Sequence, residues 1–182
     1  MAREYAPQIT FKANDLRFRK KLGTLSNRIK DLSPALKTVG RMFRESRKTI
    51  FSQRGKGKYP DFKRGGPNSL YAQQKQKEVG FKYPLLVKYG TLRSSVVDKS
   101  DPDNVTRIWK RKARFGTSVP YAKYHDSPAP RKKIPYRPFL FWGNEVPSRF
   151  KHLTSSTATF ERRALAVLKN YIITGSRRAR MR

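Results

Sequence analysis

A stretch with two prolines that leads into an apolar run constrains the fold more than any other: residues 134–143 read IPYRPFLFWG in a chain otherwise rich in charge. Proline fixes φ near about −65° and lacks a backbone donor, so Pro135 and Pro138 hold their neighbours extended and exclude them from an interior strand. We call residues 134–142 the proline strap. Its apolar side chains need partners, either in the chain's own core or in another molecule.

The side chains that follow the second proline are expected to divide between two environments. Because alternate residues of an extended segment point to opposite sides, two can enter the chain's own core while two face a neighbouring subunit. Arg137 carries a planar guanidinium that suits a carboxylate on the same or an adjacent subunit. The alternative is that the strap only closes the core of a single chain. The apolar residues concerned are Phe139, Leu140, Phe141 and Trp142.

The balance of charge limits the partners of this protein. Its 182 residues include 43 Lys and Arg against 12 Asp and Glu, so the formal net charge is +31. Such self-repulsion needs anionic surroundings, which either nucleic acid or acidic protein surfaces would supply. Charge alone does not choose between the two. Because aromatic residues make up 12% of the chain, we expect a folded body rather than a disordered chain.

Length and composition predict a single domain of a soluble protein made in the cytoplasm. We expect an N-terminal extension over 1–14, one domain over 15–175 and a basic tail over 176–182. The absence of cysteine excludes disulfides and thiolate metal sites and fits a reducing compartment. No apolar run reaches the roughly 18 to 20 residues that cross a bilayer, and the first residues lack the apolar stretch of a signal peptide.

Apolar residues spaced by three and four predict two consecutive helices near the N-terminus. The first covers 15–32 and carries one apolar stripe. The second covers 33–53, where Ser33 is expected to cap the helix and Pro34 to occupy its first turn. The two helices would pack as a hairpin or form one bent rod. The stripe of the first helix consists of Phe18, Leu22, Leu25, Ile29 and Leu32.

Glycine and proline separate these helices from the rest of the chain. Residues 54–67 hold too many of both to keep a regular period, so we expect a mobile basic loop. A helix over 69–79 follows, with Asn68 as its cap and Gly80 at its end.

The middle of the chain is predicted to form a small antiparallel sheet. The β-branched and apolar residues over 85–97 and the alternating pattern over 104–119 are typical of half-buried strands, with DKSDPDN as the turn between them. A final helix over 157–173 would end at Gly175. This order of helices, sheet and helix predicts an α+β fold.

Residues that could carry catalysis are few and poorly placed. His125 has Asp126 beside it, but neighbours in sequence point apart and no nucleophile accompanies them, so we expect a structural or interface histidine. His152 has no partner at a metal-binding spacing and is expected at the surface. The acidic turn at 98–104 lacks the glycine and glutamate of a calcium loop, and the loop at 54–67 lacks the Gly-Lys-Ser or Gly-Lys-Thr of a nucleotide site. We therefore predict no enzymatic activity, no cofactor and no metal.

Clusters of basic residues are the strongest functional signal. Five cations between positions 107 and 114 interleave with apolar residues, which favours a hairpin with a cationic face toward DNA or an acidic neighbour. The alternative is a solvated edge whose charge only prevents aggregation. Trp109 and Trp142 are expected to fill the core, with base stacking as the alternative. The cations are Arg107, Lys110, Arg111, Lys112 and Arg114, together with Arg177, Arg178, Arg180 and Arg182 of the tail.

Three segments, taken in order, resemble the phage virion morphogenesis family of tail-completion and head-to-tail joining proteins. The first is SPALKTVGRMFRESRKTIFSQRGKGKYPDF, an amphipathic helix that leads into a Gly/Lys loop. The second is LLVKYGTLRSSV, which is similar to the family's Gly-x-Leu-Arg-x-Ser. The third is FGTSVPYAKYHDSPAPRKKIPYRPFLFWG, which matches Gly-Thr, Tyr-Ala, a histidine and Ile-Pro-x-Arg-Pro-Phe-Leu. Together they span about 33–143.

The resemblance implies a non-enzymatic subunit of a hexameric ring at the neck of the virion, where the tail meets the head. Such a ring would complete the tail and surround the DNA path, in contact with acidic surfaces of adjacent connector and tail tube or sheath proteins and with no membrane. The sequence departs from the family after His125, where an apolar residue and a glycine are usual and Asp126, Ser127 and Pro128 follow here. The alternative hypothesis is a basic nucleic-acid-binding protein of ribosomal or nucleoid type. The positions that match the family, expected at subunit interfaces, are Gly90, Leu92, Arg93, Ser95, Tyr121, Ala122, His125, Arg137, Pro138, Phe139 and Leu140.

Overall fold

The computed structural model describes residues 16–52, 68–84, 86–127, 136–140 and 151–178. Within these residues the chain forms six helices and one two-stranded antiparallel sheet, which confirms the predicted α+β fold. The elements are α1 (Leu16–Lys30), α2 (Ser33–Ser52), α3 (Leu70–Val79), α4 (Thr91–Val97), β1 (Asn104–Ile108), β2 (Ala113–Thr117), α5 (Ala122–Asp126) and α6 (Lys151–Thr174).

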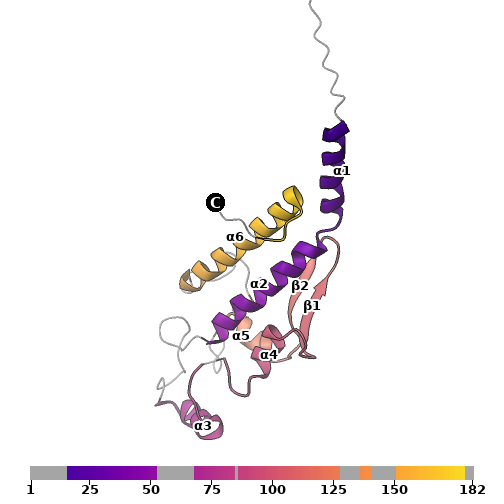
Figure 1. Ribbon diagram of the computed structural model, residues 1–182. Coiled ribbons are helices and arrows are strands. Elements are labelled where there is room, and N and C mark those ends of the chain that lie inside the picture. The colour runs from indigo at the N-terminus through magenta and orange to yellow at the C-terminus, as the bar shows by residue number, and fades with distance from the viewer. Residues whose placement is uncertain (1–15, 53–67, 85, 128–135, 141–150, 179–182) are drawn as a thin grey trace, which may run out of the picture.

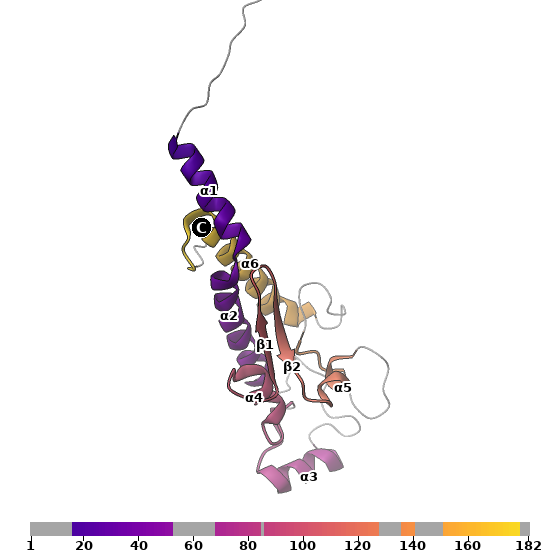
Figure 2. The same cartoon turned by 90° about the vertical axis from the view of Figure 1, so that its right-hand side faces the viewer.

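The helix α2 lies at the centre of the molecule. α6 packs along one side of α2, and the β-hairpin together with α4 covers another side (Figure 1 and Figure 2). Because α2 meets elements on both sides, its apolar residues recur at helical spacing and are buried. The core residues of these helices are Ala35, Val39, Phe43, Ile50 and Phe51 from α2, Leu92 and Val96 from α4, and Phe160, Ala164 and Val167 from α6.

The hairpin approaches α2 most closely at a glycine. A Cβ atom built on Gly40 would lie 2.7 Å from Cε1 of Phe115, so a side chain at this position would force the Phe115 ring to shift. Phe115 also stacks on Phe43, with 5.5 Å between the ring centroids. This separation is within the range in which aromatic pairs attract each other. Gly40 therefore allows the aromatic contact that joins the sheet to the central helix.

The predicted helices 33–53 and 69–79 are confirmed, but their caps differ from those expected. The N–H of Ser33 donates to Asp31 Oδ1 at 2.9 Å, so Asp31 supplies the oxygen at the start of α2. Ser69, and not Asn68, caps α3 with its hydroxyl. Gly80 ends α3 in the left-handed conformation, with φ of 79°, as predicted. The loop predicted after α2 lies outside the described residues.

The last helix, α6, is longer than predicted, because it begins at Lys151 instead of residue 157. It ends as expected before Gly175, which has φ of 79°. Arg28 of α1 donates from Nη1 to the carbonyls of Ile172 and Ile173 at 3.2 and 2.9 Å. A cation is favourable there because the last carbonyls of a helix carry partial negative charge. This contact fixes α1 to the end of α6.

The prediction of a strand over 85–97 is wrong, because residues 91–97 form α4. Gly90 has φ of 87°, a left-handed conformation that breaks an extended chain and starts the helix. Leu92, Ser95 and Val96 then recur at helical spacing and are buried. The acidic turn that follows therefore leads from a helix into β1 instead of joining two strands. The strands predicted over 104–119 are confirmed as β1 and β2.

The first two helices form a bent rod, one of the two arrangements expected. α1 continues beyond the N-terminal end of α2 and projects from the body beside the end of α6 (Figure 1). It contains no buried residue. Phe18 and Leu22 of its apolar stripe are 56% and 49% exposed. Ile29 is also 49% exposed, whereas Leu25 and Leu32 of the stripe are half-buried, so within the described part of the chain the stripe is only partly covered.

Candidate functional site

The Gly-x-Leu-Arg-x-Ser segment holds α4 against the hairpin. Gly90 begins the helix, and Leu92 enters the core with 4% of its surface exposed. The buried hydroxyl of Ser95 accepts a hydrogen bond from Thr117 Oγ1 at 2.7 Å. Arg93 is exposed. Of these four family-like positions, three therefore support the fold and Arg93 is accessible to another molecule.

The proline strap is docked on α5. Asp126 Oδ1 accepts hydrogen bonds from the backbone N–H groups of Phe139 and Leu140 at 2.9 and 3.1 Å. The carbonyl of His125 accepts a third from Arg137 N at 2.9 Å. Asp126, the residue at which the sequence departs from the family, thus supplies the acceptor that holds the strap. His125 takes part through its backbone carbonyl.

An arginine that the sequence analysis missed anchors the strap from α2. Arg47 is fully buried, and its Nη1 donates to the carbonyl of Phe139 at 2.7 Å. Its guanidinium carbon lies 5.0 Å from the centroid of the Phe43 ring, within the range of a cation–π interaction. The sequence does contain a sign of this burial, because Arg47 lies at helical spacing between the apolar residues Phe43 and Ile50.

The described strap residues are buried within their own chain. Arg137 and Phe139 are 5% and 0% exposed, Pro138 is also buried, and Leu140 is half-buried. Phe141 and Trp142, which were expected to divide between core and neighbour, lie outside the described residues. The described part of the strap therefore enters the core of its own chain, as both hypotheses expect, and a contact with a neighbouring subunit stays a prediction.

The remaining predicted site residues divide between core and surface. Tyr121 is 43% exposed, Ala122 is buried and His125 is half-buried. In the tail, Arg177 and Arg178 are exposed. The residues whose side chains lie outside the described part are His152, Arg180 and Arg182.

A second buried cation joins α3 to the chain that follows it. Lys75 is 0% exposed, and its Nζ donates to the carbonyls of Lys82 and Pro84 at 3.0 and 2.7 Å. Burial, together with the positive charges of Arg137 and Lys88, lowers the pKa of Lys75 to about 8. Because α3 lies apart from the packed layers (Figure 2), these hydrogen bonds help to fix its position.

The β-hairpin has different chemistry on its two faces. The register pairs Arg107 with Arg114, and the N–H of Trp109 donates to the carbonyl of Lys112 at 2.8 Å. Paired residues, and residues two apart on a strand, point to the same side, so these four side chains share one face. All four are exposed, whereas Phe115 on the opposite face packs against α2. We call the four exposed residues the outer hairpin face.

Trp109 lies at the surface, so the expectation that it fills the core is wrong. Its side chain is 43% exposed, and the Lys112 ammonium lies 5.0 Å from its ring centroid. The physical reason is the hairpin register, which puts this position on the face opposite to Phe115. Trp142 lies outside the described residues.

The hairpin turn rests on the junction between α1 and α2. Leu32 N donates to the Lys110 carbonyl at 2.7 Å. Hydrogen bonds from Ser33, assisted by the nearby charges of Lys110 and Lys37, lower the pKa of Asp31, so this carboxylate stays ionised near neutral pH. A hollow of about 830 Å³ lies at the junction, and its lining residues are Asp31, Ser33, Ile108, Trp109, Lys110, Arg111 and Lys112.

An apolar groove lies between α2, β2 and α6. Its volume is about 580 Å³, and among its lining residues Leu165 is 63% exposed. Three cations and no carboxylate line it within the described chain. The apolar lining consists of Leu36, Val39, Phe43, Ala113, Phe115, Leu140, Ala164, Leu165 and Leu168, and the cations are Arg111, Lys112 and Arg114.

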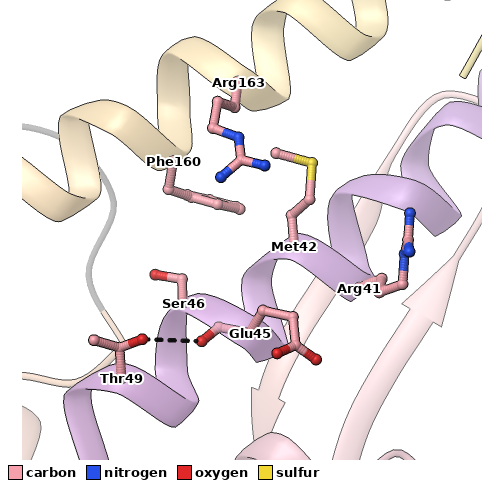
Figure 3. Close-up of a pocket in the computed structure, with 7 residues that line it drawn as sticks. All are labelled: Arg41, Met42, Glu45, Ser46, Thr49, Phe160 and Arg163. Atoms are coloured by element: carbon pink, nitrogen blue, oxygen red, sulfur yellow. Dashed lines mark hydrogen bonds between the residues drawn. The ribbon is translucent and has the colours of Figure 1, made fainter. Parts of the chain in front are cut away.

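A smaller hollow separates α2 from α6. Phe160 and Arg163 project from α6 toward Met42 and Ser46 of α2 (Figure 3). The volume is about 440 Å³, and Glu45 is the one carboxylate among the described residues that line it. Because catalysis by proton transfer needs a positioned acid and base, this lining does not form a recognisable active site.

The described part of the chain shows neither a metal centre nor a membrane-spanning helix. No three His, Asp or Glu side chains in it gather where they could hold a metal ion. Among its helices, none combines the length and the apolar character needed to cross a bilayer. In comparisons with known proteins, no family model, no curated protein and no solved structure matches the chain. The described part of the chain offers three surfaces to another molecule: the α1 stripe, the apolar groove and the outer hairpin face.

Proposed function

We propose that the protein is a structural subunit of a phage neck or tail-completion ring, built from copies of this chain around the DNA path. The observation that carries the proposal is α1, a helix of 15 residues that buries none of its side chains and exposes an apolar stripe. An isolated helix of this length is marginal in water, and helices in proteins gain most of their stability by packing such a stripe. In the working assembly, α1 is therefore packed against another molecule.

The resemblance to the phage virion morphogenesis family supports the choice of a virion ring. The described parts of the similar segments contact one another, because Ser95 meets β2 and the strap meets both α5 and Arg47 of α2. This arrangement gives most of the described family-like residues a structural role within the subunit and leaves Arg93 and Tyr121 exposed.

The partner that we propose for the α1 stripe is the apolar groove of a second copy. The stripe and the groove lie on different elements of one chain, so their contact is head-to-tail. Head-to-tail contacts generate closed rings when the rotation between subunits permits closure. Phe18 and Leu22 of one subunit would then cover Leu165 and Leu168 of the next, and apolar side chains exposed on both sides would leave water.

Positive charge opposes this contact, which gives the assembly a defined dependence on salt. α1 carries basic residues and no acidic one, and the groove is edged by cations. Salt shortens the range of this repulsion to about 8 Å at physiological ionic strength and leaves the apolar contact intact. Self-association should therefore increase with salt concentration. In the virion, DNA and the acidic surfaces of adjacent connector and tail proteins would neutralise the ring.

Sedimentation of the purified protein at increasing sodium chloride concentration tests the ring. Leu22→Gln should reduce the oligomer formed at high salt, because it places an amide on the α1 stripe. Leu70→Gln is the matched control, since Leu70 of α3 is 85% exposed and lies outside the proposed contact. Equal assembly of the two variants would exclude this contact.

Electron micrographs of phage particles made without the protein test its place in the virion. We expect tails that are separate from filled heads. Tails joined normally to filled heads would overturn the proposal.

The exposed Trp109 among cations favours a second candidate, a nucleic-acid-binding protein of ribosomal or nucleoid type. This candidate predicts that the protein cofractionates with ribosomes or the nucleoid in cells. This candidate also predicts that phage made without the protein still join tails to heads normally.

A further inference from the structure

The outer hairpin face, Arg107, Trp109, Lys112 and Arg114, combines an exposed ring with fixed cations. We propose that this face binds single-stranded nucleic acid, with one base stacked on Trp109 and the neighbouring phosphates held by the surrounding cations. The site is a property of the isolated chain and does not depend on ring formation.

The exposure of Trp109 is the first observation behind this site. An indole buries a large apolar surface in most folds, and here 43% of the side chain stays in solvent although Phe115, close by on β2, packs on α2. Every base has a flat π-face, so an exposed aromatic ring among cations binds unpaired bases with little dependence on their sequence. The Lys112 ammonium lies over the indole ring, 5.0 Å from its centroid, so a base that stacks on Trp109 takes the opposite face of the ring or displaces this flexible side chain.

The pairing of Arg107 with Arg114 is the second observation. Like charges directly opposite each other destabilise an antiparallel pair of strands. The ion pairs found in the described part of the chain lie elsewhere, at Glu45–Lys48 and Glu78–Lys88. A polyanion that lies across the two strands would contact both guanidinium groups and remove their repulsion. Residues two apart on a strand are about 7 Å apart, so these cations flank the indole closely.

The hairpin turn is also held in place before any ligand arrives. Its Lys110 carbonyl accepts a hydrogen bond from Leu32 N at 2.7 Å, which ties the turn to the helical body. A fixed arrangement of ring and cations lowers the entropy cost of binding. The adjoining hollow of about 830 Å³ offers space next to Trp109, with the ionised Asp31 as an acceptor for base amino groups.

Nucleic acid fits this face better than an acidic protein surface does. Carboxylates would satisfy the cations, but they have no flat aromatic face to cover the indole. A base-paired duplex would also satisfy the cations, but its bases are already stacked on one another. The combination of ring and cations therefore selects unpaired nucleotides.

Tryptophan fluorescence tests the stacking directly. The chain contains two tryptophans, so Trp142→Phe leaves Trp109 as the single indole. This protein is titrated with a 16-nucleotide single-stranded DNA of mixed sequence, the same sequence as a duplex, inorganic polyphosphate and poly-glutamate. We expect quenching of Trp109 by the single strand, and binding without comparable quenching for the polyanions that lack unpaired bases.

Affinity measurements on two variants separate stacking from charge. Trp109→Leu should weaken binding of the single strand by about 5- to 100-fold, as expected for the loss of one stacked base. Tyr89→Leu is the matched control, because Tyr89 is 72% exposed beside Lys88 but lies outside the hairpin. Replacing both Arg107 and Arg114 by Gln should reduce the dependence of log affinity on log salt by about 1.4, or about 0.7 for each lost phosphate contact.

The outcomes decide the proposal whether or not the ring exists. Quenching by single strands, together with selective loss in Trp109→Leu, supports it. Binding without quenching and without an effect of Trp109→Leu would overturn it, because the cations would then act as a general polyanion surface. Tighter binding of poly-glutamate than of DNA, weakened by Trp109→Leu, would assign the face to an acidic protein and would equally overturn it.

Discussion

Arg47 Nη1 lies 2.7 Å from the carbonyl oxygen of Phe139, and this hydrogen bond joins α2 to a residue 92 positions further along the chain. The Phe139 ring also lies 5.5 Å from the ring of Phe51, measured between centroids. The described part of the proline strap is therefore a component of the core and is held by polar and aromatic contacts together.

The first prediction concerns the burial of Phe139. Phe139→Ala should lower the free energy of unfolding by about 3 to 5 kcal/mol, because it leaves a cavity beside Phe51 and Arg47. Urea denaturation followed by circular dichroism measures this loss. Phe18→Ala is the control, since Phe18 is 56% exposed on α1, and it should cost less than about 1 kcal/mol. Similar losses in both variants would contradict the burial of the strap.

A second prediction concerns the acceptor that docks the strap. Asp126→Ala removes the oxygen that pairs with the N–H groups of Phe139 and Leu140. Each partly buried donor left without a partner costs about 1 to 3 kcal/mol, so unfolding should become easier and both amides should exchange faster with solvent. Asp126→Asn keeps one acceptor oxygen and should retain most of the stability. Unchanged amide exchange in Asp126→Ala would show that the strap does not need this residue.

A third prediction follows from the buried amine of Lys75. Its pKa is about 8 in the folded chain and 10.5 for the ordinary group, so between these values the unfolded state binds more protons. The free energy of unfolding should therefore rise as the pH is raised from about 8 to 10.5, by up to about 3 kcal/mol. Below this range Lys75 is protonated in both the folded and the unfolded chain, so burial of its charge lowers the free energy of unfolding to the full extent.

Denaturation across this pH range, with variants of α3, isolates the contribution of Lys75. Lys75→Met removes the titrating group and should abolish most of the increase in the free energy of unfolding between pH 8 and 10.5. Lys77→Met changes an exposed lysine of the same helix and should leave this increase unchanged. If the two variants show the same dependence on pH, the rise has another origin.

A fourth prediction compares two glycines within helices. Gly40→Ala places a methyl group against Phe115 and should cost about 1 to 3 kcal/mol, because the packed Phe115 ring must shift. Gly23→Ala meets no atom within 4 Å and should stabilise α1 by up to about 1 kcal/mol, since alanine favours the helix. Thermal unfolding of both proteins measures the difference. A stabilising Gly40→Ala would mean that β2 does not pack this closely on α2.

The long helices could be predicted from the sequence because their buried faces repeat regularly. Val39, Phe43 and Ile50 on α2 recur at the spacing of a helix that is covered by other elements along its length. Gly80 and Gly175 mark helix ends because their left-handed conformations are rarely adopted by other residues. These signals are local, so they do not depend on knowing what the helix packs against.

The errors arose where the structure depends on contacts between distant segments. The β-branched residues near Val96 suit a strand, but the packing of Leu92 and Ser95 against the hairpin favours a short helix. Trp109 was expected in the core because aromatic residues usually are, and only the hairpin register reveals that it faces outward. Arg47 resembles a surface cation until the strap is placed beside it.

The hydrogen bond between Leu32 N and the Lys110 carbonyl has a mechanical consequence. Leu32 lies where α1 joins α2, and Arg28 holds the same stretch of α1 to the end of α6. The C-terminal end of α1 is thus fixed by hydrogen bonds to two different elements, the hairpin turn and α6. A molecule that binds the hairpin turn and shifts it would therefore also change the orientation of α1 relative to the rest of the chain.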